Sequence, residues 1–231
     1  ITEMSHRSKP FMAVNAEAQA LLRELMNIPD DYPVLFVQGG ASQQFAAVPL
    51  NLMNKNKKAD YIVSGQFSGK AQKEATKYGD VKIAASSKDA NFSFVPKTDR
   101  SSFRADADYV HITHNNTIYG TRFKDIPDTG DVPLVADMSS SILSQPIDVS
   151  KFGLIYAGAQ KNMGPSGLTV VIIREDLLDE VNNDIPVMLD YRVAADNGSM
   201  YNTPPCYSIY VAGLVFKWLL ETGGLEEREK I

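Results

Sequence analysis

The sequence has little cysteine and no long apolar run. Its single cysteine, Cys206, excludes a disulfide within the chain and fits a reducing compartment. The longest apolar runs, such as residues 168–173, are far too short to cross a bilayer. No signal peptide is visible either. These absences predict a cytoplasmic protein with no membrane partner.

Basic clusters and metal-ligand patterns are also missing. The chain has 23 Lys and Arg against 28 Asp and Glu, a net charge of −5, and the basic residues form no block. A nucleic acid is therefore not expected as a partner. The three histidines, His6, His111 and His114, have no cysteine or carboxylate at ligand spacing, so no metal site is expected.

What the chain does contain is an ordinary globular composition and an alternating pattern. It has 231 residues, of which 44% are hydrophobic, enough for one large core. Apolar, β-branched runs alternate with helical patterns, which predicts an α/β fold in which helices flank a mostly parallel sheet. The expected strands are 34–37, 60–64, 81–84, 108–113, 133–136, 153–157 and 168–174. The expected helices are 15–27, 42–54, 68–78, 174–181 and 208–222.

Local signals refine the helix boundaries. Asn15 is expected to cap the first helix, and Gly223-Gly224 should stop the last. Pro49 should kink or shorten the second helix, because proline has no N–H to donate. No linker divides the chain, so residues 1–231 are expected to form one domain.

Chemically useful residues follow several of the expected strands. In open α/β sheets, ligands bind beyond the carboxyl ends of the strands. Those ends carry a glycine turn, an aromatic ring, a hydroxyl, a carboxylate and a lysine: Gly39-Gly40, Phe67, Thr117, Asp137 and Lys161. Each has an ordinary interpretation by itself, but five strand ends each offering a different part favour one shared site.

This combination suits one cofactor. A desolvated lysine has a lowered pKa and becomes a nucleophile toward carbonyl carbons. A lysine that forms a Schiff base, together with an aspartate for a pyridinium nitrogen, is typical of pyridoxal 5′-phosphate (PLP) enzymes. The glycine turn before a helix would hold the phosphate through backbone N–H groups. Lys161 and Asp137 are thus candidates for the catalytic pair, although a surface lysine and a strand-end turn remain open alternatives.

Longer segments make the pattern specific. The stretch 135–178, which contains "ADMSS" and "AGAQKN", resembles the lysine-bearing segment of the phosphoserine aminotransferase family, class V enzymes of PLP fold type I. "QGGASQQF", "SGQF", "HITHNNTIYGT", "YNTPP" and "SHRS" resemble further blocks of that family, in the same order. The resemblance covers essentially the whole chain. It implies the large, PLP-binding domain at 1–231, without the family's N-terminal segment and small C-terminal domain.

The resemblance also implies roles for single residues. Lys161 matches the Schiff-base lysine, and Asp137 matches the carboxylate that keeps the pyridine nitrogen protonated. The implied cofactor contacts are Ala41, Ser42, Phe67, Thr117, Asp137, Gln160, Lys161, Asn202 and Thr203. Phe67 stands where the family often has Trp, and Ala41-Ser42 stand where many members have Gly-Arg.

Substrate and partner follow from the same resemblance. His6 and Arg7 match residues that bind the substrate's anionic group, and Asn202 and Thr203 match residues supplied by a neighbouring subunit, which implies a homodimer with shared active sites. The implied reaction transfers the amino group of L-glutamate to 3-phosphohydroxypyruvate and gives O-phospho-L-serine. It belongs to serine biosynthesis and, in some bacteria, to pyridoxine biosynthesis.

Two alternatives stay open at this stage. One is another class V PLP enzyme, such as an alanine–glyoxylate transaminase or a cysteine desulfurase. Cys206 lies beside Pro204-Pro205, a rigid context that counts against the mobile cysteine of a desulfurase. The other is a PLP-binding or dimerising fragment without turnover, because the family's small domain supplies an arginine for the substrate α-carboxylate.

Overall fold

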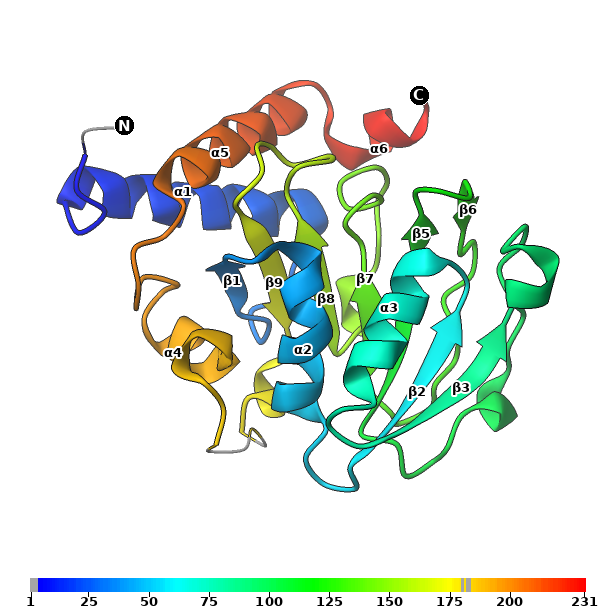
Figure 1. Cartoon of the computed structure of the whole chain (residues 1–231). Coiled ribbons are helices and arrows are strands. Elements are labelled where there is room, and N and C mark those ends of the chain that lie inside the picture. The colour runs from blue at the N-terminus through cyan, green and yellow to red at the C-terminus, as the bar shows by residue number, and fades with distance from the viewer. Residues whose placement is uncertain (1–3, 180, 182–183) are drawn as a thin grey trace.

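Seven apolar segments pair into one sheet (Figure 1). The computed structural model describes residues 4–179, 181 and 184–231, and the order of strands across its sheet is β1-β9-β8-β7-β4-β2-β3. The strands are β1 (Val34–Val37), β2 (Lys58–Val63), β3 (Asp80–Ser86), β4 (Tyr109–Thr113), β7 (Leu134–Asp137), β8 (Leu154–Gly158) and β9 (Thr169–Ile173). All seven strands predicted from the sequence are confirmed, with ends shifted by at most a few residues.

Only one of the seven strands runs against the others. β9 is antiparallel to both of its neighbours, β1 and β8, whereas the pairs β8–β7, β7–β4, β4–β2 and β2–β3 are parallel. The mostly parallel sheet is therefore confirmed. Because six strands share one direction, their carboxyl ends meet at one edge of the sheet.

Helices cover both faces of this sheet (Figure 1). Successive strand residues point to opposite faces, so Phe36 joins a core with α1 (Lys9–Met26) and α5 (Cys206–Glu221). Its neighbour Leu35 joins a second core with α2 (Gly40–Leu52) and α3 (Gln66–Ala75). The chain thus forms three layers, as expected for an α/β fold.

Smaller elements join the layers, and the sequence patterns did not reveal them. They are a hairpin of β5 (Asn115–Asn116) and β6 (Thr121–Arg122), and the helices α4 (Tyr191–Asp196) and α6 (Gly224–Glu229). The hairpin follows β4 at the carboxyl edge of the sheet. It is the element among these that matters for the site.

The start of α1 differs from the prediction. The helix begins at Lys9, with Ser8 as its N-cap: the Ser8 hydroxyl accepts a hydrogen bond from the backbone N–H of Phe11 at 3.4 Å. Asn15 is buried inside the helix, and its side-chain amide donates to the Gly198 carbonyl. The N-cap assigned to Asn15 was wrong, because this polar side chain serves a tertiary contact instead.

Two other helix predictions also changed. Residues 174–181 were expected to form a helix, but the structure has only a 3₁₀ turn, Glu175–Leu177, and residue 180 lies outside the described residues. Arg174 and Asp176 pair with each other there, at 2.6 Å between Nε and Oδ1, and Leu177 is buried. The second change concerns Pro49, which does not end α2: the helix continues to Leu52. The predicted stop of the last long helix is confirmed, because α5 ends before Gly223-Gly224.

In the part of the chain that the structure describes, no helix combines the length and the apolar character needed to cross a membrane.

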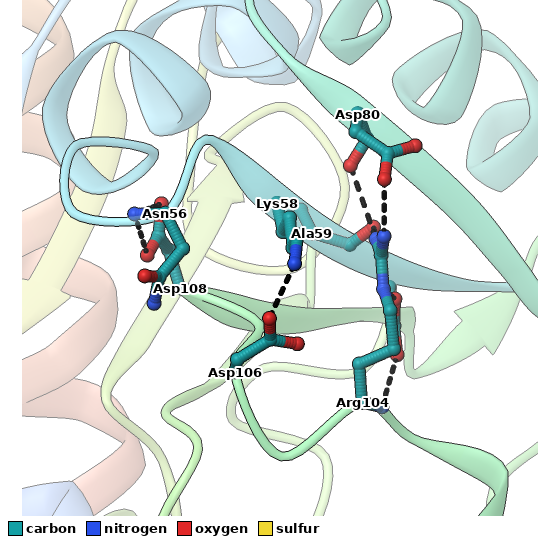
Figure 2. A network of polar contacts seen from close by, with 8 residues as sticks. Asn56, Lys58, Ala59, Asp80, Arg104, Asp106 and Asp108 are labelled. Atoms are coloured by element: carbon teal, nitrogen blue, oxygen red, sulfur yellow. Dashed lines mark hydrogen bonds and ion pairs between the residues drawn. The ribbon is translucent and has the colours of Figure 1, made fainter.

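A buried ion pair ties the amino end of β2 to the loop before β4 (Figure 2). Asp60 is fully buried, and it accepts hydrogen bonds from the backbone N–H and from Nε of Arg104, both at 2.7 Å. The same guanidinium donates to the carbonyls of Ala59 and Asp80. A second ion pair, between Lys58 and Asp106, lies nearby on the surface.

Replacing Arg104 should therefore destabilise the fold. Arg104→Ala leaves the Asp60 carboxylate buried without its counter-charge, and breaking such a pair costs about 3–5 kcal/mol in the free energy of unfolding. Lys58→Ala is the matched control, because losing an exposed pair costs at most about 1 kcal/mol. Urea denaturation of both variants measures the difference, and similar losses in the two would contradict the assignment.

Candidate active site

A cavity of about 160 Å³ opens at the carboxyl edge of the sheet. Segments far apart in the sequence meet there: the start of α2, the start of α3, the β5–β6 hairpin and the ends of β4, β7 and β8. The lining residues are Gly40, Ala41, Ser42, Phe45, Phe67, Thr113, Asn115, Thr117, Asp137, Ser139, Ser140, Gln160 and Lys161. Larger hollows exist elsewhere, but their linings do not combine a lysine and a buried carboxylate with the start of a long helix.

Lys161 reaches into this cavity from the segment that follows β8. Its Nζ donates a hydrogen bond to Oγ1 of Thr117 at 2.7 Å and lies 5.5 Å from the centroid of the Phe67 ring. Lys161 is exposed in this chain, whereas the nucleophile considered from the sequence would be desolvated.

The β5–β6 hairpin places Thr117 opposite the lysine. The Asn116 side-chain amide donates to Oγ1 of Thr121 at 3.0 Å and to Oγ of Ser64 at 3.2 Å, which joins the hairpin to the segment after β2. The Asn115 amide donates to Oγ of Ser140 at 2.8 Å, which joins the hairpin to the segment after β7. The position of Thr117 is thus fixed by neighbouring strand ends.

Asp137 is the last residue of β7 and is only 5% exposed. Its Oδ1 accepts two hydrogen bonds from Ser139, one from the backbone N–H at 2.9 Å and one from the hydroxyl at 2.7 Å. Burial raises the pKa of the Asp137 carboxyl, although the Ser139 bonds and the charge of Lys161 act in the opposite direction. The carboxylate form would consequently gain from a cation placed against it.

The glycine turn leads directly into α2. Gly39 and Gly40 have φ of 88° and 66°, and a Cβ on Gly39 would lie 1.5 Å from Oε1 of Gln43, so glycine is needed there. No side chain caps this helix, and Gly40, Ala41 and Ser42 line the cavity. The N–H groups of the first turn have no acceptor within the helix, and they make its start suitable for an anion.

The other predicted contacts lie partly elsewhere. Gln160 lines the cavity together with Phe67, as predicted. Asn202 borders a separate hollow, and the Thr203 carbonyl accepts a hydrogen bond from Gln38 at 2.7 Å. His6 and Arg7 precede α1, and neither lines the cavity of its own chain. For these four residues the predicted roles stay predictions that depend on a second subunit.

Two buried histidines, His111 in β4 and His114 directly after it, do not line the cavity. His111 stacks on Tyr61, and its Nε2 shares a hydrogen bond with the Tyr156 hydroxyl at 2.9 Å. Burial lowers the pKa of His111 to about 3, so the ring is neutral at physiological pH. His114 bonds Ser141 through Nδ1, and burial lowers its pKa to about 4. Among the described residues, no three His, Cys, Asp or Glu side chains gather as metal ligands.

Ser139 is the functional candidate that the sequence analysis missed. The signal was present as Asp-x-Ser, a pattern in which serine hydrogen-bonds a carboxylate two residues earlier. The same pattern occurs on the surface at Asp99–Ser101 and Asp148–Ser150. Sequence alone therefore could not tell which of the three copies faces a cavity.

The arrangement suits a phosphorylated aromatic aldehyde. An amine that can attack a carbonyl, a buried carboxylate on the neighbouring strand, an aromatic ring and an uncapped helix start all open on one cavity. The carboxylate with a raised pKa matches a ring nitrogen that carries a proton. The residues present therefore fit the cofactor that Lys161 and Asp137 suggested.

Comparisons with known proteins agree with this description. Residues 1–231 match the family described as "Aminotransferase class-V". A phosphoserine aminotransferase of Pseudomonas aeruginosa (strain LESB58) is 57% identical over 230 residues, which is 100% of this chain and 64% of that protein. The chain thus spans about two thirds of the length of such relatives.

Solved structures give the same match. A phosphoserine aminotransferase from Bacillus circulans subsp. alkalophilus is 50% identical with a TM-score of 0.95, and the match covers 99% of this chain and 63% of that one. A PLP-bound phosphoserine aminotransferase from Trichomonas vaginalis is 41% identical with a TM-score of 0.92, over 99% of this chain and 68% of that one. The predicted resemblance is confirmed, and the chain belongs to the class V aminotransferase family.

Proposed function

We propose that this protein is a PLP-dependent phosphoserine aminotransferase. The reaction takes L-glutamate and 3-phosphohydroxypyruvate and gives 2-oxoglutarate and O-phospho-L-serine. The observation that carries the proposal is the cavity that Lys161, which follows β8, shares with Asp137, at the end of the neighbouring β7, beside the start of α2. The 57% identity to a phosphoserine aminotransferase supports the choice of substrate.

Each part of the cavity has a role toward the cofactor. The first-turn N–H groups at Ala41 and Ser42 would hold its phosphate, Phe67 would pack on its ring, and Asp137 would hold a proton on its ring nitrogen. When bound, PLP supplies an electron sink for the electron pair left by a broken Cα–H bond.

Lys161 performs the proton transfer in this proposal. Its Nζ would hold the cofactor and, as a free amine, would take the proton from the substrate Cα and deliver it to the other carbon of the transfer. Thr117 accepts a hydrogen bond from this nitrogen, which restrains the position of the amine. The amino donor and the amino acceptor would use the same lysine in turn, so the reaction would consist of two half-reactions.

The substrate's anionic end requires a further cation. Arg7 can bind a carboxylate or a phosphate through two parallel hydrogen bonds. Since it does not line the cavity of its own chain, we assign it, with His6, Asn202 and Thr203, to the site of a partner subunit in a homodimer. Exposed large side chains on α5 support an interface on this side: Tyr207, Tyr210, Leu214 and Trp218, each between 37% and 56% exposed.

Hybrid dimers test the shared site. Lys161→Ala and Arg7→Ala should each be inactive as homodimers. A mixture that has exchanged subunits should regain activity, because one site then combines an intact lysine with an intact arginine. A mixture that stays inactive although native mass spectrometry of differently tagged subunits shows hybrid dimers would exclude the shared arrangement.

A substrate comparison tests the function. With glutamate as donor, the purified protein should convert 3-phosphohydroxypyruvate much faster than hydroxypyruvate, pyruvate or glyoxylate, with 2-oxoglutarate and phosphoserine formed in equal amounts. A preference for an unphosphorylated acceptor would point to another class V transaminase. A cofactor spectrum without any product would favour a binding protein without turnover. Cell fractionation would test the expected cytoplasmic location.

A further inference from the structure

We propose that Ser139 is a positioning residue: it occupies one oxygen of the Asp137 carboxylate and thereby presents the other to the cofactor's ring nitrogen. The inference rests on the proposed PLP-dependent function and adds a residue to it. Ser139 lines the cavity and is 5% exposed, like Asp137 itself.

Both hydrogen bonds from Ser139 go to the same oxygen. The backbone N–H and the hydroxyl reach Oδ1 of Asp137 at 2.9 and 2.7 Å. Among the residues that the structure describes, none donates a hydrogen bond to Oδ2. Two donors on one oxygen fix the rotation of the carboxylate, so Oδ2 is the oxygen left for an external donor.

A third contact fixes the direction of the hydroxyl proton. The backbone N–H of Gly158 donates to Oγ of Ser139 at 3.1 Å. Because an N–H can only donate, Oγ uses a lone pair for Gly158, and its own proton points to Asp137. Ser139 therefore bridges the end of β7 to the end of β8, the strand that continues to Lys161.

The chain contains a matched surface copy of this turn. Ser150 donates to Oδ1 of Asp148 from its backbone N–H, at 3.1 Å, and from its hydroxyl. Asp148 and Ser150 are both exposed, and neither lines the cavity. Ser150→Ala removes the same local hydrogen bond without touching the site, and it separates a general effect on turns from an effect on the cofactor.

The test compares PLP with its 1-deaza analogue, in which a C–H replaces the ring nitrogen. Apoprotein is prepared from the holoenzyme and titrated with each compound. Ser139→Ala should bind PLP about tenfold more weakly than the parent, the scale of one lost hydrogen bond to a charged group. For the analogue, the parent and Ser139→Ala should bind equally, because Oδ2 has no proton to hold. Ser150→Ala should match the parent for both.

A second variant guards against misfolding. Ser139→Cys keeps the shape with a weaker donor and should fall between the parent and Ser139→Ala in PLP affinity. Equal losses for PLP and the analogue, or no loss for PLP in either Ser139 variant, would overturn the positioning role. A parent protein that binds no PLP would instead overturn the proposed function, and the inference with it.

Discussion

Lys161→Ala is expected to abolish both turnover and the visible absorbance band of bound PLP. The variant removes the only amine that lines the cavity in the described chain. It deletes a nucleophile and a general base at once. General base catalysis alone contributes about 10²–10⁴-fold, so kcat should fall by at least about 10⁴-fold. Stopped assays over long incubations and one visible spectrum measure the two effects.

Lys70→Ala is the matched control for this loss. The Nζ of Lys70 lies 5.4 Å from the centroid of the Phe67 ring, almost the same distance as that of Lys161, but Lys70 does not line the cavity. Its replacement should leave the spectrum and kcat unchanged. Borohydride reduction of the parent should also place a phosphopyridoxyl group on Lys161, as seen by peptide mass spectrometry. A label on another lysine, or an intact band in Lys161→Ala, would exclude the assignment.

The sequence predicted the frame of this site better than its details. Strand ends were predictable because buried parallel strands are continuous apolar runs, and the residue after each run can be read directly. Lys161, Asp137, Phe67 and Thr117 come together because their strands are neighbours with a common direction. Nothing in the local pattern shows that order of strands, and the resemblance to a known family supplied what periodicity lacks.

The failures have a common physical cause. Asparagine is a common helix N-cap, but the side-chain amide of Asn15 instead donates a hydrogen bond to the distant Gly198 carbonyl. Ser139 looks the same in sequence as Ser101 and Ser150, and only the packing around the end of β7 distinguishes it. In both cases a tertiary contact decides between local options that are close in free energy, and such contacts are not visible in a short window of sequence.

The exposed position of Lys161 has the same origin. The residues next to Lys161 in the sequence do not decide whether its amine is buried, because exposure depends on what covers the cavity mouth. The predicted partner residues, His6, Arg7, Asn202 and Thr203, are those that do not line the cavity of their own chain. In the proposed dimer, the second subunit would cover the mouth of the cavity and thereby desolvate the lysine amine.

Asp137→Asn is expected to cause the second-largest loss, with kcat lower by about 10³-fold, the scale for removing one fixed electrostatic contact in a buried site. The amide can still accept both Ser139 hydrogen bonds through Oδ1, so the turn is preserved. What disappears is the negative charge at Oδ2, which holds a proton on the ring nitrogen. Asp148→Asn, in the surface copy of the turn, should leave kcat unchanged.

Stability separates this loss of activity from a loss of fold. Burial raises the pKa of Asp137 above that of an unfolded chain, so ionising this carboxyl costs folding free energy at neutral pH and costs nothing below the unfolded pKa. Asn carries no such cost. The cofactor-free Asp137→Asn protein should therefore unfold at the same or a higher urea concentration than the parent at pH 7, and this advantage should vanish as the pH falls below the unfolded pKa. A variant that is both inactive and less stable at pH 7 would mean that Asp137 supports the fold, whereas an inactive and equally stable one places its charge in the service of the cofactor.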